Sequence, residues 1–166
     1  VSRVDSVALY RHLEHRRCVA DGERRARSNC ARQQDPRDRW RHRALDDRRS
    51  TPYAWGSNDC ATFAADMIAA VTGQDLAAAF RHRYKSQVGA RRMLKAHGWK
   101  DLEALADDLL PRQDGRKQRG DVVLYAGRHG AFLGIYWQGL VWGPGPAGLA
   151  WWPSDPDAIL ATWKVG

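Results

Sequence analysis

A cysteine at the start of a predicted helix constrains this chain more than any other feature of its sequence. Asn58, Asp59 and Cys60 precede a run in which apolar residues recur at helical spacing, and Gly73 supplies a stop. Asn58 is a favourable N-cap residue, and Asp59 suits the first turn because its charge complements the helix dipole. The pattern therefore predicts a helix that begins with a thiol and ends before Gly73.

Two roles are open to the thiol of Cys60. The positive end of a helix and its unpaired N–H groups stabilise a thiolate, which lowers the pKa of a cysteine from about 8.5 and favours a nucleophile. Cys60 also lies four residues before Ala64, on the apolar face of the helix, and free cysteine is among the residues most often buried. On this stretch alone, a structural cysteine is favoured over a nucleophile.

Composition divides the chain at about residue 50. The chain has 166 residues and a formal net charge of +8; residues 1–50 hold 14 Arg and 8 Asp or Glu, a net +6, which leaves +2 for residues 51–166. The first segment is poor in apolar residues and keeps no sustained period, so it cannot bury enough surface to offset the entropy of ordering. We expect an Arg-rich extension over residues 1–50, either disordered or the product of a start site called too early, and one α+β domain over residues 51–166.

Composition also argues against several classes of partner and cofactor. The extension suits phosphate contacts, but it holds few of the aromatic side chains that stack on bases, Trp40 among them, so nucleic acid is not the expected partner. The three cysteines show no metal-ligand spacing, so no metal, cofactor or disulfide framework is expected. No apolar run approaches the roughly 20 residues that span a membrane, and no signal-peptide core opens the chain, so synthesis as a soluble cytoplasmic protein is expected.

Helical patterns fill the first half of the expected domain. Asp75 can cap a short helix through Phe80, Ser86 can cap a second that closes at Gly98, and Asp101 opens a third that Pro111 ends. A polar connection follows at residues 112–119.

Strand patterns fill the second half. Residues 121–125 and 131–137 flank a turn at residues 127–130 and predict a hairpin, and further strands are expected at residues 140–142, 149–152 and 161–165. Residues 143–146, Gly-Pro-Gly-Pro, are expected to break the chain. Most of the eight Trp are expected in the core. Helices followed by an antiparallel sheet indicate the α+β class.

The motifs in this layout resemble those of the NlpC-like cell-wall peptidases of the papain-like superfamily, and more closely small phage-tail and prophage proteins related to them. The resemblance rests on Trp-Gly-x-x-Asp-Cys at residues 55–60, on Gly-Asp-Val-Val-Leu at residues 120–124, and on Leu-Gly-Ile-Tyr at residues 133–136. Residues 53–65, 73 and 75, and 84–98 also contribute. It implies a papain-like core in which the helix of Cys60 packs on a small antiparallel sheet.

The resemblance also implies site residues. Cys60 falls on the position of the nucleophile, but the position of the catalytic histidine, before the Val-Gly-Ile-Tyr type of strand, is occupied by Phe132. His129, three residues earlier, could act as the base only if the turn that carries it reaches Cys60. Asp121 and Gln138 are the candidates for the polar residue that would orient this histidine.

Two functions are therefore expected. One is a cysteine hydrolase that cleaves peptide bonds in peptidoglycan stem peptides, with Cys60 as nucleophile and His129 as base. The other is a peptidase-fold protein without activity, which associates with phage-tail proteins as a structural or assembly component and is found in the virion tail. Phe132 is the reason for the second.

Overall fold

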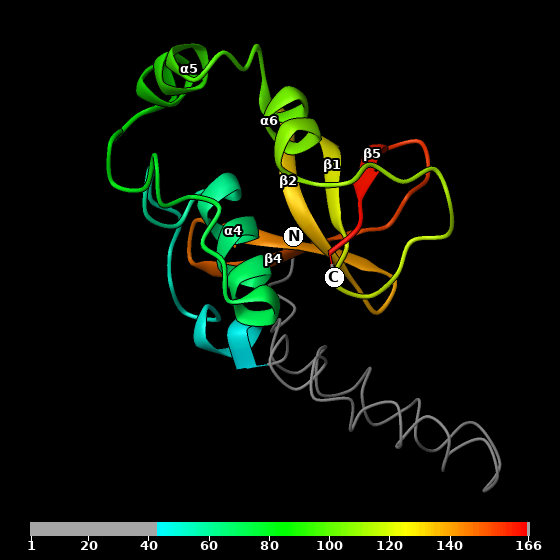
Figure 1. The fold of residues 1–166 in the computed structure, drawn as a ribbon. Helices are drawn as coiled ribbons and strands as arrows, with labels where there is room; N and C mark the ends of the chain where they lie inside the picture. The colour runs from blue at the N-terminus through cyan, green and yellow to red at the C-terminus, as the bar shows by residue number, and fades with distance from the viewer. Residues whose placement is uncertain (1–42, 166) are drawn as a thin grey trace, which may run out of the picture.

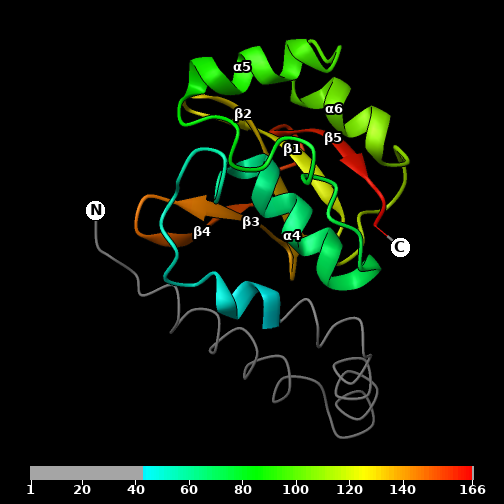
Figure 2. The same cartoon turned by 60° about the vertical axis from the view of Figure 1, so that its left-hand side comes forward.

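The computed structural model describes residues 43–165, in which α4 and α6 pack on one face of a five-stranded antiparallel sheet (Figure 1). The elements follow the chain in this order: α4 (Cys60–Thr72), α5 (Gln87–Ala96), α6 (Leu102–Leu109), β1 (Val122–Gly127), β2 (Gly130–Trp137), β3 (Leu140–Gly145), β4 (Gly148–Pro153) and β5 (Ile159–Trp163). A short helix over residues 43–47 precedes them. In the turned view of Figure 2, α5 lies at the edge of the domain above α6, and α4 crosses the sheet. The helices-then-sheet layout confirms the predicted α+β class.

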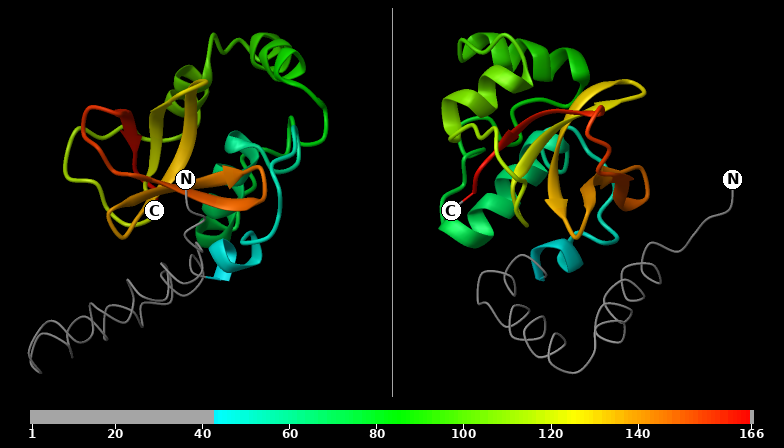
Figure 3. Two further views of the ribbon diagram at one scale, coloured as in Figure 1. Left: turned by 180° about the vertical axis from the view of Figure 1, so that it is seen from behind. Right: turned by 90° about the vertical axis from the view of Figure 1, so that its right-hand side faces the viewer.

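The sheet has the strand order β4-β3-β2-β1-β5. Three hairpins join β1 to β4 in chain order, and β5 then returns to pair with β1. Pairing between β2 and β3 extends only from Ile135↔Trp142 to Trp137↔Leu140, and beyond it the two hairpins separate. Figure 3 shows the β1–β2 hairpin in yellow and the β3–β4 hairpin in orange running in clearly different directions. The sheet is therefore strongly twisted, as expected for hairpins of L-residues.

Local capping signals predicted two further helices correctly. The Ser86 side chain caps α5 by accepting from the Gly89 N–H at 3.1 Å, and Asp101 caps α6 by accepting from the Ala104 N–H at 2.8 Å. The short helix expected after Asp75 is wrong, because residues 76–82 form turns. Its five apolar-patterned residues are too few to offset the cost of helix nucleation.

The expected break at residues 143–146 is also wrong for its first three residues. Gly143, Pro144 and Gly145 complete β3 and pair with β4, with Pro144 opposite Leu149. Proline is tolerated there because β2 no longer pairs with this part of β3, so the missing N–H interrupts only one side of the strand. The β3–β4 hairpin is consequently longer than the pattern of apolar residues indicated.

The two faces of the sheet carry separate apolar clusters. Leu133, Ile135 and Trp137 of β2 belong to the main core, which α4 and α6 cover, while Phe132 and Tyr136 belong to a second cluster on the other face. This follows from the alternation of side chains along a strand. The predicted core role of the tryptophans is confirmed where burial is complete, at Trp137, Trp142 and Trp163.

Residues 43–50, which composition grouped with the Arg-rich extension, pack on the domain. Leu45 is buried in the main core, and the Arg49 carbonyl accepts from the Leu149 N–H of β4 at 3.0 Å. Arg48 forms an ion pair with Asp66 of α4, which also pairs with Arg81 at 2.7 Å. No helix among residues 43–165 is long and apolar enough to cross a membrane.

Candidate functional site

The site around Cys60 begins with the cap of α4, which is Asp59 and not Asn58. The Asp59 carboxylate accepts from the N–H groups of Ala61 at 3.1 Å and Thr62 at 3.0 Å, and the Thr62 hydroxyl accepts from the Asp59 N–H at 2.9 Å. This reciprocal pair is a capping box. The Asn58 amide is used elsewhere, since it donates to the carbonyls of Thr51 and Pro52 at 3.0 Å each. The expected end of the helix is confirmed, because Gly73 caps it at φ 76°.

Gly56 links this cap to a distant part of the chain. Its N–H donates to the second oxygen of Asp59 at 2.7 Å, and its carbonyl accepts from the His82 N–H at 2.7 Å. The residue has φ +74°, and a Cβ placed on it would lie 2.3 Å from the carbonyl oxygen of Tyr84. The glycine of the Trp-Gly-x-x-Asp-Cys motif is therefore required both by backbone conformation and by space.

Cys60 is the first residue of α4 and packs, partly buried, against the main core. Burial raises the pKa of its thiol to about 11, and the neighbouring Asp59 carboxylate adds to the rise. The backbone N–H groups of Leu133, Ala61 and Cys60 itself act in the opposite direction and lower the pKa in part. The net shift of the Cys60 pKa is upward, opposite to the lowering that a helix N-terminus alone predicts. Cys60 is therefore a neutral thiol at pH 7.

Two tyrosines complete the surroundings of Cys60. Tyr84 is buried, and its pKa is raised by burial and by its hydrogen bond to the Asp59 carboxylate. The pKa of Tyr53 is raised by burial and by the charges of Cys60 and Asp59. Neither tyrosine was predicted from the sequence to have a role in the site. No local pattern could have found them, because Tyr84 is separated from Asp59 by 25 positions in the sequence.

The structure does not bring His129 to Cys60. His129 is exposed in the two-residue turn between β1 and β2, whereas the β2 residue whose N–H reaches the sulfur is Leu133. His129 lies four positions before Leu133, a span of roughly 13 Å along an extended strand. A hydrogen bond between His129 and Cys60 would need the hairpin to fold back on itself.

Phe132 lies on the opposite face of the sheet from α4. Its ring packs at 4.6 Å from Trp152 and 5.4 Å from Tyr125, between ring centroids. Gly127, Gly134 and Gly143 make room for it, since a Cβ on each would come within 4 Å of the ring. A histidine side chain at this position would point into the aromatic cluster and away from the thiol.

The two polar candidates for a third residue have different surroundings. Asp121 is buried and accepts from the Gln118 N–H at 2.6 Å and from the side-chain amide of Gln113, so it fastens the polar connection to β1. Gln138 lies in the β2–β3 turn with φ 52°. Within residues 43–165, no group of three or more His, Cys, Asp or Glu side chains gathers as a metal site would require.

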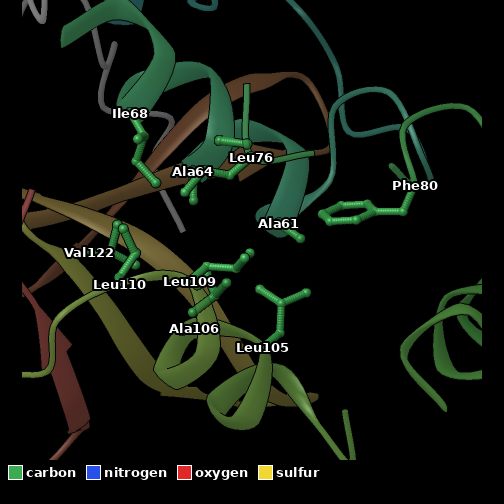
Figure 4. Close-up of a pocket in the computed structure, with 12 residues that line it drawn as sticks. Ala61, Ala64, Ile68, Leu76, Phe80, Leu105, Ala106, Leu109, Leu110 and Val122 are labelled. Carbon is green, nitrogen blue, oxygen red and sulfur yellow. The ribbon is translucent and has the colours of Figure 1, made fainter. Parts of the chain in front are cut away.

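A small pocket lies beside the first turn of α4. It is formed by apolar side chains of α4, α6, β1 and β2, among them Ala61, Leu105 and Leu133, and encloses about 20 Å³ (Figure 4). That volume is close to one water molecule, and the lack of polar groups in the lining favours a dry cavity. The pocket is too small to hold a peptide.

Comparison with known proteins places the chain in a family. A family described as a domain of unknown function, DUF6950, matches residues 32–165. No curated protein matches the sequence. The match covers most of the chain, including the cap of α4, Cys60 and the whole sheet. The chain therefore belongs to the DUF6950 family.

Proposed function

We propose that this chain is an NlpC-like domain of papain-like type without peptidase turnover, which serves as a structural or assembly component of a phage tail. The observation that carries the proposal is the set of groups around Cys60. The thiol lies beside the Asp59 carboxylate and is electrostatically coupled to Tyr53 and Tyr84, and its pKa is raised to about 11. A nucleophilic cysteine needs a free base within hydrogen-bond reach. The raised pKa values of Tyr53 and Tyr84 keep both phenols protonated at pH 7, and the Asp59 carboxylate is occupied by the N–H groups of Gly56, Ala61 and Thr62.

Phe132 supports the same proposal. The active peptidases that the sequence resembles carry their histidine at this position, and here it is an aromatic residue in a packed cluster. The resemblance to phage-tail proteins supplies the setting. In this proposal the protein is made in the cytoplasm and is incorporated into the virion tail.

The proposal is tested by isolating assembled particles that carry a tagged copy of the full chain. We expect the tagged chain to co-purify with tail proteins, and a Cys60→Ala variant to do so equally well. Purified full chain should leave isolated peptidoglycan intact in a muropeptide analysis. Cys60-dependent release of stem-peptide fragments, with no tail protein retained, would overturn the proposal.

A cysteine hydrolase is the second candidate, and the N–H groups around the sulfur favour it. The Leu133 N–H, which lowers the pKa of the thiol, would stabilise a thiolate at Cys60. In this mechanism His129 takes the Cys60 proton, the sulfur attacks the carbonyl carbon of the stem peptide, and the C–N bond breaks as the leaving amine takes that proton. Water then hydrolyses the thioester, which releases the carboxylic acid and restores the thiol. Loss of cleavage in both Cys60→Ala and His129→Ala would establish this candidate; cleavage that persists in His129→Ala would exclude His129 as the base.

A further inference from the structure

The positive charge of residues 51–166 is concentrated in one stretch. Residues 76–100 contain seven Arg or Lys and no Asp or Glu, which is a net +7. Residues 51–75 contain three Asp and no Arg or Lys, and residues 101–166 contain eight Asp or Glu and six Arg or Lys, so they carry −3 and −2. The modest overall +2 therefore conceals a strongly basic segment within an acidic remainder.

Most of this charge is exposed and unpaired. Arg81 forms ion pairs with Asp66 and Asp75. The other six basic residues are exposed and form no ion pair with any carboxylate among residues 43–165. We call these six the basic surface: Arg83, Lys85, Arg91, Arg92, Lys95 and Lys100.

Helix α5 presents the centre of the basic surface. Met93 and Leu94 are buried, whereas Arg91, Arg92 and Lys95 are exposed. The helix itself lies at the edge of the domain (Figure 2). Arg91 and Lys95 stand four residues apart, a spacing at which like charges weaken a helix, and no acidic residue of α5 offsets them. The repulsion gives the helix no stability, and exposed positive charge of this kind is suited to contact with a negatively charged partner.

A pair of stacked rings beside the basic surface indicates which kind of negatively charged partner could bind there. His97 and Trp99 lie between Lys95 and Lys100 in the sequence, with ring centroids 5.0 Å apart and planes only 7° from parallel. The stack is held in place because the His97 ring hydrogen bonds to the Met93 carbonyl at 3.0 Å and the Trp99 indole donates to Asp108 at 3.1 Å. His97 is exposed, so its ring is accessible for a further stacking partner.

We propose that the basic surface, together with the His97–Trp99 stack, binds single-stranded nucleic acid. Cationic side chains contact the phosphates, and the stacked rings accept an unpaired base, which is the combination that single-strand binding requires. Nucleic acid was not the partner expected from the sequence, because residues 1–50 have few aromatic rings. The basic surface lies in another part of the chain and has the rings of His97 and Trp99 beside it. The proposal does not depend on the role of Cys60.

The test measures binding of the full chain to a fluorescent single-stranded oligonucleotide of about 20 nucleotides by anisotropy. One variant combines Arg91→Ala, Arg92→Ala and Lys95→Ala. The control combines Arg116→Ala, Arg128→Ala and Lys164→Ala, which removes the same charge from exposed positions elsewhere. Both variants keep the Arg-rich residues 1–42, so any contribution of that segment cancels.

We expect the α5 variant to bind at least about 10-fold more weakly than the control at low salt, and its slope of log affinity against log salt to fall by about 2, as for three lost phosphate contacts. His97→Ala should weaken single-strand binding about fivefold with an unchanged slope, and should leave duplex binding unaffected. Equal losses in the α5 variant and the control would overturn the proposal. Equal binding of duplex, or tighter binding of polyglutamate, would also overturn it, the latter in favour of an acidic protein partner.

Discussion

A single methyl group at Gly56 tests the geometry of the site around Cys60 directly. Gly56 has φ +74°, and a Cβ there would lie 2.3 Å from the Tyr84 carbonyl oxygen. Carbon and oxygen atoms in close contact are about 3.3 Å apart, so the two backbone segments must separate by about 1 Å in Gly56→Ala. Such a movement weakens two hydrogen bonds, the one that the His82 N–H donates to the Gly56 carbonyl and the one that Tyr84 donates to the Asp59 carboxylate.

The expected cost has two parts. A left-handed conformation costs a non-glycine residue about 1–2 kcal/mol. Weakening two buried hydrogen bonds adds about 1 kcal/mol each, so the free energy of unfolding should fall by about 3–4 kcal/mol. Gly73 offers a matched control, because it has φ +76° but a methyl group added to it would meet no atom within 4 Å. Gly73→Ala should therefore show only the conformational part, about 1–2 kcal/mol.

The measurement is urea unfolding of the full chain, followed by tryptophan fluorescence, for the parent and both variants. The difference between the two variants isolates the effect of the contact with Tyr84. If Gly56→Ala and Gly73→Ala lose the same stability, the close approach of residues 56 and 84 is wrong, and with it the account of the glycine in the motif. A larger loss in Gly56→Ala supports both.

Three further predictions concern Cys60, Asp121 and Phe132. Because burial raises the pKa of Cys60 to about 11, the unfolded chain loses this proton at a lower pH than the folded chain does. The free energy of unfolding should therefore fall between pH 9 and pH 11 in the parent, by up to about 2–3 kcal/mol, and by less in Cys60→Ala, as pH-dependent unfolding would show. Asp121→Ala should lower the free energy of unfolding by about 1–3 kcal/mol in urea titrations, since two donors lose their partner, and an unchanged midpoint would contradict this. Phe132→His should lower the melting temperature without creating peptidoglycan cleavage, because the side chain faces away from Cys60; new Cys60-dependent cleavage would show that the assigned face is wrong.

Features set by neighbouring residues were predictable from the sequence. The caps at Ser86 and Asp101 and the stop at Gly73 depend on hydrogen bonds and backbone conformation within one helical turn. The β1–β2 hairpin was found in the same way, since two apolar runs flank a short turn. Asn58 and Asp59, by contrast, are both good caps, and the choice between them depends on carbonyls of residues 51 and 52 that the Asn58 amide reaches.

Features set by distant residues were not predictable. The extension of β3 through Pro144 depends on where β2 stops pairing, which is a property of the twisted sheet. The tyrosines beside Cys60 come from segments on either side of it, brought together by the bond between Gly56 and His82. The direction of the Cys60 pKa shift also depends on distant residues. Burial raises the pKa by more than the N–H groups at the start of the helix lower it.

The contacts around Asp59 give the motif residues structural roles that do not require the chemistry of the peptidases that the motif resembles. Gly56 is needed for its conformation and its approach to Tyr84, and Asp59 satisfies the N–H groups of Gly56, Ala61 and Thr62. The start of α4 would need both residues even if Cys60 never acted as a nucleophile. A Trp-Gly-x-x-Asp-Cys sequence is thus evidence for this loop and helix, while evidence for catalysis has to come from a base beside the thiol. That is why the variants at Cys60, His129 and Phe132 bear on function, and those at Gly56 and Gly73 bear on the fold.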